Sequence, residues 1–200
     1  MPDMLLTTRF IEALTYAAVL HADQKSKGKD VPYIAHLLGV TSIALDSGAD
    51  EDQAIAALLH DAVEDQGGRN QLETIRNRFG DKVARIVEDC SDSFSIPKPP
   101  WGERKKAYLE HLQHIGPDSL LVSAADKLYN ARSILQDHRK VGEKVWGRFK
   151  GGHDGSLWYY RELVTRYRQM INKEHPSELS RLVDELDLVV TDLEKLDAGI

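Results

Sequence analysis

Hydrophobic positions recur at helical spacing along most of this 200-residue chain. From residue 7 to residue 24, for example, apolar side chains return every three or four positions, which predicts an amphipathic helix. Further helices are predicted over residues 34–47, 50–67, 70–80, 81–92, 103–115, 118–136, 154–170 and 177–195. No segment stands out with the strict alternation of a half-buried strand. We therefore expect an all-α fold, a bundle of about eight to ten helices.

Residues that begin or interrupt helices mark the predicted boundaries. The predicted N-caps are Asp50, Asn70 (with Glu73 as a capping box), Asp81, Asp154 and Ser177. Three prolines within residues 97–100 cannot lie inside a helix and predict a loop. A glycine-rich stretch follows at 142–155. We expect residues 1–175 to form one domain and residues 176–200 to add a C-terminal helical extension.

The composition is that of a globular protein, with 42% hydrophobic and 29% charged residues. No apolar run approaches the roughly 20 residues of a membrane span, so no membrane partner is expected. The single cysteine, Cys90, suits a reducing compartment, and the N-terminus carries no secretory signal, which together predict a cytoplasmic location. A net charge of -6 argues against general binding of nucleic acid.

Basic residues nevertheless gather in three stretches, at 25–29, 98–106 and 139–150. Each stretch taken alone is typical of a solvated surface. Three of them in an acidic chain indicate a small polyanionic ligand as an alternative.

The helix predicted over 50–67 carries ionisable groups in an apolar setting. Residues 55–63 are apolar nearly all round, apart from His60 and Asp61, and such a helix is normally buried. A buried, unpaired carboxylate costs at least several kcal/mol, so these two residues need partners. A divalent cation bound by both residues would be such a partner. Glu64 and Asp65 follow four positions after His60 and Asp61, on the same faces of the helix.

Two other residues lie in comparable apolar surroundings and are candidates for further metal ligands. They are His36, in "PYIAHLLGV", and Asp126, in "LLVSAADKLYN". Two imidazoles and two carboxylates together suit Mn²⁺, Fe²⁺ or Zn²⁺ better than thiophilic metals. Without a metal, His36 would be a hydrogen-bonded core histidine, and Asp126 would cap a helix or pair with a lysine.

Four segments carry a resemblance to a known family. "HADQKSKGKDVPYIAH", "AIAALLHDAVED", "FGDKVARIVEDCSD" and "LLVSAADKLYNARSIL" occur here in the order and spacing of the RelA/SpoT-type (p)ppGpp hydrolase domain. That domain belongs to the HD superfamily of metal-dependent phosphohydrolases. Over residues 7–165 the chain most resembles the small stand-alone hydrolases of the metazoan SpoT-homologue type and their bacterial relatives. The resemblance implies an HD-domain helical bundle.

The resemblance also implies roles for individual residues. The implied ligands of a Mn²⁺ ion are His36, His60, Asp61 and Asp126. Glu64 and Asp65 would orient and activate the attacking water. The implied substrate-binding residues are Lys25, Asn130, Tyr159 and Tyr160, of which one tyrosine would line the nucleotide pocket. Ordinary helix packing is the alternative for Asn130 and the tyrosines.

The implied activity is removal of pyrophosphate from the 3′ position of guanosine tetra- or pentaphosphate. The implied partner is therefore a small-molecule nucleotide. Ser26 stands where the family usually has Arg, and Leu37 where it usually has Pro. The missing Arg belongs to the substrate-contacting loop. Ser26 therefore leaves a second interpretation open, a phosphohydrolase that acts on another nucleotide phosphate ester. A non-catalytic nucleotide-binding module is a third interpretation, against which the intact Glu64 and Asp65 speak. The sequence carries no indication of the oligomeric state.

Overall fold

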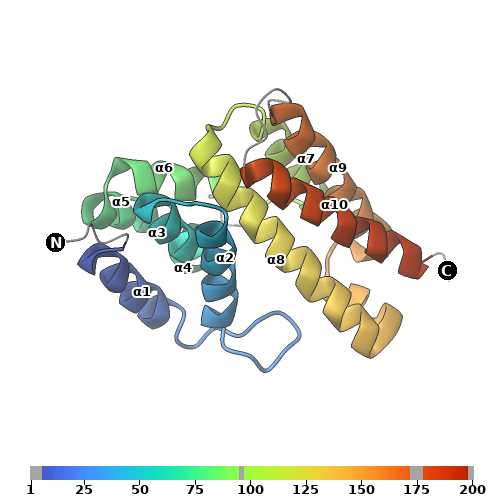
Figure 1. Cartoon of the computed structure of the whole chain (residues 1–200). Helices are drawn as coiled ribbons and strands as arrows, with labels where there is room; N and C mark the ends of the chain where they lie inside the picture. The colour runs from blue at the N-terminus through green and yellow to red at the C-terminus, as the bar shows by residue number, and fades with distance from the viewer. Residues whose placement is uncertain (1–5, 95–96, 172–177, 198–200) are drawn as a thin grey trace. The chain divides into compact units, whose positions relative to one another are not determined.

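The protein is described by a computed structural model that covers residues 6–94, 97–171 and 178–197 (Figure 1). These residues form ten α-helices and one 3₁₀ helix, and no strand is present among them. An isolated antiparallel bridge joins Lys25 to Pro32. The predicted all-α fold is confirmed. Among the described helices, none combines the length and the apolar character of a membrane span.

The chain divides into two compact units. The first contains the described residues of Met1–Lys98 and Ile115–Ser123, and the second those of Pro99–His114 and Ala124–Ile200. The expected boundary near residue 175 stays a prediction.

Six helices belong to the first unit. They are α1 (Thr8–Leu20), α2 (Ile34–Asp46), α3 (Glu51–Leu59), α4 (Ala62–Gln66), α5 (Gly68–Phe79) and α6 (Asp81–Cys90). Helix α3 packs against α1, α2 and α6, and all its side chains from Gln53 to Leu59 are buried. This helix is therefore the centre of the core of the unit.

The N-terminus of α3 agrees with the prediction, but its C-terminus does not. The Asp50 carboxylate accepts a hydrogen bond from the backbone N–H of Gln53 at 2.9 Å, and the Gln53 side chain accepts one from the backbone of Asp50 at 2.8 Å. The single helix predicted over 50–67 is wrong, because α3 ends at Leu59 and α4 begins at Ala62. The interruption lets His60 and Asp61 face each other, whereas consecutive residues of a regular helix do not.

Two further N-cap predictions in this unit are wrong because glycines let the chain turn without a capping side chain. Gly67 and Gly68 have φ angles of 143° and 59°, so α5 begins at Gly68 and Asn70 lies inside its first turn. Gly80, with a φ of 95°, precedes α6. Asp81 is consequently the first helical residue, and its carboxylate pairs with Arg76 at 2.9 Å.

The helices of the second unit are α7 (Trp101–His111), most of α8 (Pro117–Val141), η1 (Gly142–Arg148), α9 (Gly152–Met170) and α10 (Glu178–Asp197). Helix α7 begins directly after Pro100, so the predicted proline loop ends at that residue. The predicted N-cap at Asp154 is wrong, because α9 already begins at Gly152. Ser177, predicted to cap the last helix, lies outside the described residues.

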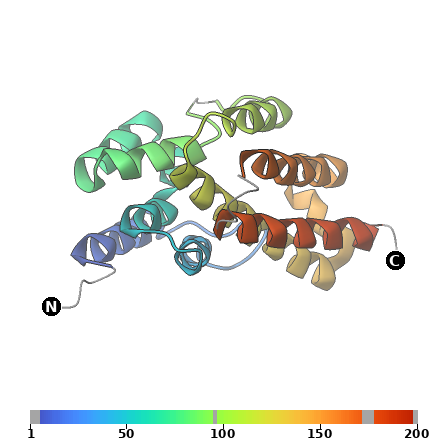
Figure 2. The same ribbon diagram turned by 45° about the horizontal axis from the view of Figure 1, so that its top comes forward.

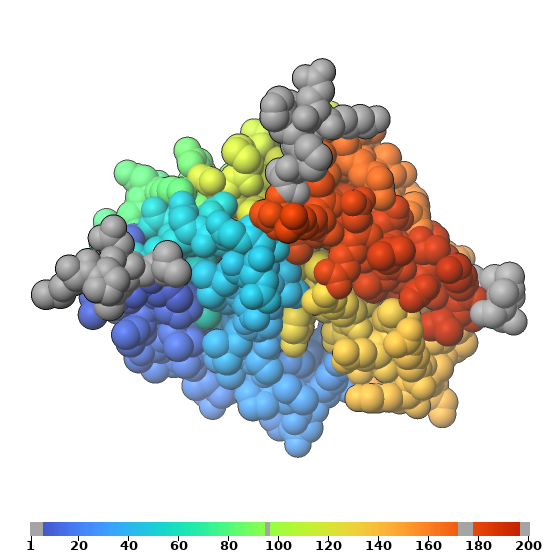
Figure 3. Space-filling view, in the orientation of Figure 1, coloured from blue at the N-terminus to red at the C-terminus, as the bar shows by residue number. Residues whose placement is uncertain are grey.

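The last helix is an integral part of the second unit. Helices α9 and α10 lie side by side (Figure 2), and the outer side of α10 is at the molecular surface (Figure 3). The buried side of α10 consists of Leu182, Val183, Leu186, Val190 and Leu193. Arg161 of α9 also donates hydrogen bonds to Glu194 at 3.0 Å and to Thr191 at 3.2 Å.

Candidate metal and catalytic site

A hydrogen bond to the backbone orients the ring of His60. The side chain is buried in the turn between α3 and α4, and its Nδ1 lies 2.8 Å from the carbonyl oxygen of Ala57. A carbonyl can only accept, so Nδ1 carries a proton, and Nε2 is the ring nitrogen left to bind a metal ion. A backbone hydrogen bond on the other ring nitrogen is the usual way in which a metal-binding histidine is oriented.

Two more side chains converge on Nε2 of His60. His36 is buried on α2, and its Nε2 lies 3.2 Å from Nε2 of His60. Oδ2 of Asp61 is 3.1 Å from the His60 nitrogen and 3.3 Å from the His36 nitrogen. Burial alone would raise the pKa of Asp61, but His60 and His36 hold it well below its usual range. The carboxylate is therefore ionised, and it also accepts a hydrogen bond from the Tyr33 hydroxyl.

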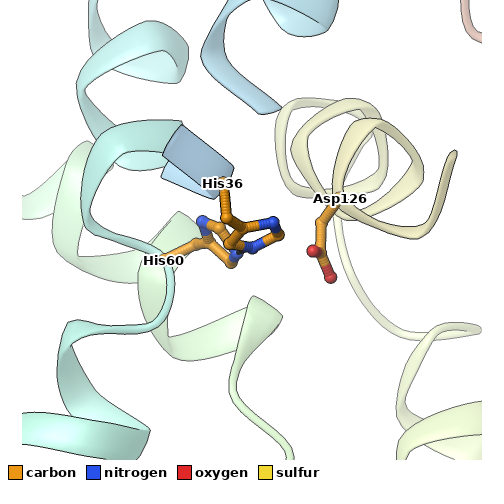
Figure 4. Close-up of side chains that lie close together, drawn as sticks. All are labelled: His36, His60 and Asp126. Carbon is orange, nitrogen blue, oxygen red and sulfur yellow. Dashed lines mark hydrogen bonds between the residues drawn. The ribbon is translucent and has the colours of Figure 1, made fainter. Parts of the chain in front are cut away.

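Asp126 is the third member of a buried His-His-Asp group. Figure 4 shows its carboxylate beside the two imidazole rings, and one ligand atom from each of the three residues lies within 4.8 Å of the others. Asp126 is carried by α8, three residues beyond Ser123 in an uninterrupted helix. The first turn of α8 is attached to α6, because the Ser119 hydroxyl donates to Asp89 at 2.6 Å.

Both carboxylate oxygens of Asp126 are held by neighbours on α8. Asn130 donates to Oδ1 at 2.6 Å, and the Lys127 ammonium pairs with Oδ2. Lys127 is half-buried, with its nitrogen 5.1 Å from the centre of the Tyr108 ring. Burial alone would lower the pKa of Lys127, but Asp126 holds it well above its usual range, so the pair is ionic. Pairing with a lysine is the alternative to metal binding that the sequence leaves open for Asp126, and Lys127 is that lysine.

Glu64 and Asp65 lie on α4, one turn beyond His60 and Asp61. Oε1 of Glu64 accepts the backbone N–H of Asp92 at 2.6 Å. Burial, together with the carboxylates of Asp92 and Asp61, raises the pKa of Glu64 to about 7. Burial and Asp61 likewise raise the pKa of Asp65. A carboxyl group that titrates near neutrality is suited to taking up and releasing a proton.

Lys98 is the cation that faces this acid pair. Its ammonium nitrogen lies 3.1 Å from Oε2 of Glu64 and 3.9 Å from Oδ1 of Asp65. Lys98 is the first residue of the basic stretch 98–106, in which nothing in the sequence distinguishes it from its neighbours. Its partners could not be read from the sequence, because Lys98 lies in a loop and they lie more than 30 positions away, on α4.

The four predicted substrate-binding residues have different surroundings. Asn130 contacts Asp126, and the buried Tyr160 has its pKa raised by burial and by the Asp126 carboxylate. Tyr159 is buried against Trp101, with the Lys105 nitrogen 4.8 Å from its ring centre. Lys25 is exposed in the loop after α1 and pairs with Asp30. The binding roles of these residues stay predictions.

Comparison with known proteins identifies the family. Residues 13–151 match the model of the HD domain. The chain is 42% identical over 127 residues to the guanosine-3′,5′-bis(diphosphate) 3′-pyrophosphohydrolase MESH1 of Xenopus tropicalis, which is 62% of this chain and 68% of that protein. It is 38% identical over 129 residues to MESH1 of Homo sapiens, which is 63% of this chain and 69% of that protein.

A solved structure agrees with these sequence matches. It belongs to a metazoan orthologue of SpoT described as hydrolysing ppGpp and playing a role in starvation responses. The two chains superpose with a TM-score of 0.69 at 26% identity, over 90% of this chain and 94% of the other. The chain therefore belongs to the HD-domain family, in the group of metal-dependent phosphohydrolases that contains the MESH1 enzymes.

Proposed function

We propose that His36, His60, Asp61 and Asp126 together hold one divalent metal ion. The observation that carries the proposal is the convergence of two imidazole nitrogens and a carboxylate oxygen within 3.3 Å of one another. A shared cation would hold the two imidazole nitrogens and the carboxylate oxygen around one point. The hydrogen bond between Nδ1 of His60 and the Ala57 carbonyl, which leaves Nε2 for the metal, supports the same interpretation.

The donor set also restricts the metal. Two nitrogens and two carboxylates suit Mn²⁺, with Fe²⁺ and Zn²⁺ as alternatives, and they do not suit a thiophilic ion. A bound ion of this kind lowers the pKa of water and polarises a phosphoryl oxygen. We assign Mn²⁺ as the cofactor on this basis and on the resemblance to the (p)ppGpp hydrolases.

The acid pair would handle the proton of the attacking water. Glu64, with a pKa raised to about 7, can exist as a carboxylate that accepts a proton and as an acid that returns it. Asp65 lies beside it and shares the Lys98 contact, so the two carboxylates can orient one water between them. No covalent nucleophile is needed, because water serves as the attacking group.

We propose that the substrate is guanosine tetra- or pentaphosphate and that the product is pyrophosphate from its 3′ position. The identity to the MESH1 enzymes and the likeness to the SpoT orthologue support this choice. Lys25, Asn130, Tyr159 and Tyr160 remain the proposed substrate contacts, and a cytoplasmic location remains the proposed setting. Ser26, in place of the usual Arg, favours a second candidate, a phosphohydrolase for another nucleotide phosphate ester.

Metal analysis of purified variants tests the site separately from the substrate. His60→Ala and Asp126→Ala should each lower the metal content and abolish hydrolysis. A double Glu64→Gln, Asp65→Asn variant should keep its metal but lose turnover by roughly 10²–10⁴-fold, the usual contribution of general acid–base groups. Full metal occupancy with normal turnover in either single variant would remove that residue from the ligand set.

A further inference from the structure

Gln24 connects three side chains around the acid pair. Its side-chain nitrogen donates a hydrogen bond to Oδ2 of Asp65 at 2.7 Å. Its side-chain oxygen lies 2.7 Å from Nδ1 of His21 and accepts a hydrogen bond from the Gln66 amide at 2.9 Å. The sequence alone does not single out Gln24, because its partner Asp65 lies 41 positions further along the chain.

The orientation of the Gln24 amide follows from the chemistry of its partners. The side-chain NH₂ of Gln24 faces Oδ2 of Asp65, because an amide nitrogen donates and a carboxylate oxygen accepts. The oxygen then faces His21 and Gln66, and both must donate to it. His21 is buried at the end of α1, so its ring cannot turn away to water and holds Gln24 in one orientation.

The backbone of Gln24 is fixed as well. Its carbonyl accepts the N–H of Tyr33 at 2.9 Å, which closes the base of the loop that contains Lys25 and Pro32. Tyr33 uses its hydroxyl to donate to Asp61. The two residues at the base of this loop therefore each deliver one hydrogen-bond donor, Gln24 to the acid pair and Tyr33 to the proposed metal ligand.

We propose that Gln24, held by His21 and Gln66, is the positioning residue that orients Asp65 for its work on the attacking water. The inference rests on the proposed function, because it gives Asp65 a catalytic role. An acid at a surface-facing helix position has several rotamers, and a fixed donor on one oxygen selects one of them. Gln24 acts through Asp65 and need not touch the substrate.

The first test compares two glutamine variants in the full-length, Mn²⁺-loaded protein, with guanosine-3′,5′-bis(diphosphate) as substrate. Gln24→Met keeps the length of the side chain but loses the donor. It should lower kcat by roughly 10–100-fold, the scale of a small misplacement of a catalytic group, and leave the metal content and KM near those of wild type. Gln71→Met is the matched control, because Gln71 donates a similar bond, at 2.7 Å, to Tyr16 in the same unit. Its kcat should stay at the wild-type value.

The second test asks whether Gln24 acts through Asp65 and His21. Adding Gln24→Met to Asp65→Asn should lower kcat no further than Asp65→Asn alone, because the two residues act as one unit. His21→Leu should resemble Gln24→Met. His21→Asn retains an N–H near the position of Nδ1 and should restore most of the lost rate, which a purely structural role of the histidine would not explain.

The outcomes separate the inference from the proposed function. A normal kcat in Gln24→Met, or losses that multiply in the double variant, would overturn the positioning role while Asp65→Asn still impairs the enzyme. If Asp65→Asn has normal turnover, or if wild type does not hydrolyse the nucleotide, the proposed function fails and the inference fails with it.

Discussion

The ammonium nitrogen of Lys98 lies 3.1 Å from Oε2 of Glu64. Burial and the neighbouring Asp92 and Asp61 raise the pKa of Glu64 to about 7. The contact with Lys98 acts in the opposite direction. Lys98 favours the ionised form and holds the pKa lower than it would otherwise be. It therefore lowers the pH below which Glu64 loses its charge, against the larger effects of burial and of the two carboxylates.

Replacing Lys98 should move the acid limb of the pH–rate profile. In Lys98→Met the pKa of Glu64 rises further, so turnover should begin to fall at a higher pH than in wild type. The loss of kcat should accordingly be larger near pH 6 than near pH 8.5. Lys82→Met is the control, because Lys82 pairs with Asp50 and Asp118 instead. An acid limb that does not move would show that Glu64 is not the group that titrates.

The raised pKa of Glu64 also has a cost in stability. A carboxyl group with an ordinary pKa of 4.5 and a folded pKa of about 7 binds its proton more tightly in the folded state. The free energy of unfolding therefore falls as the pH rises through this interval. In metal-free protein, Glu64→Gln should be more stable than wild type at about pH 8, by about 1–3 kcal/mol, and should lose most of this advantage near pH 4.5.

Urea denaturation of the metal-free proteins at the two pH values measures this difference. Glu73→Gln is the matched control, because Glu73 is an exposed glutamate on α5 and the substitution should change little at either pH. A Glu64→Gln variant that is less stable than wild type by the same amount at both pH values would contradict this expectation. It would show that the charged carboxylate of Glu64 does not destabilise the folded protein.

Trp101 packs directly on the backbone of Gly151. A Cβ atom at residue 151 would lie 2.7 Å from two carbon atoms of the indole ring, closer than real contacts allow. The ring is also bordered by Trp158 and Tyr159, so it cannot move freely. Gly151→Ala should lower the free energy of unfolding by roughly 1–3 kcal/mol, the range for overpacking. Gly147→Ala, where no atom lies within 4 Å of the added Cβ, should change it little in the same urea experiment.

Local sequence signals predicted the helices better than their ends. The N-cap at Asp50 was predicted, because a capping side chain and its partner lie within one turn. The break at His60 and Asp61 was not predicted, because the apolar pattern of the sequence continues through these two residues. The starts of α5 and α6 were misplaced because a glycine with positive φ replaced the expected side-chain cap.

In the candidate site, too, the residues with a local sequence signal could be predicted and the others could not. His36, His60 and Asp126 could be singled out, because each is an ionisable residue in an apolar segment, and the structure brings them together. Lys98 and Gln24 could not, because their significance lies in partners that are distant in sequence. From the sequence alone, each of these two residues would be an ordinary polar residue exposed to solvent.

The central claim is that a metal-dependent site in this protein releases pyrophosphate from the 3′ position of a guanosine nucleotide. The most direct measurement incubates the Mn²⁺-loaded protein with a nucleotide panel and quantifies pyrophosphate and orthophosphate separately, with Asp126→Ala and metal-free wild type as controls. We predict the highest kcat/KM for guanosine-3′,5′-bis(diphosphate), with pyrophosphate as the product and no turnover in either control. A nucleoside monophosphate as the best substrate with orthophosphate as the only product, or undiminished activity without metal, would contradict the claim.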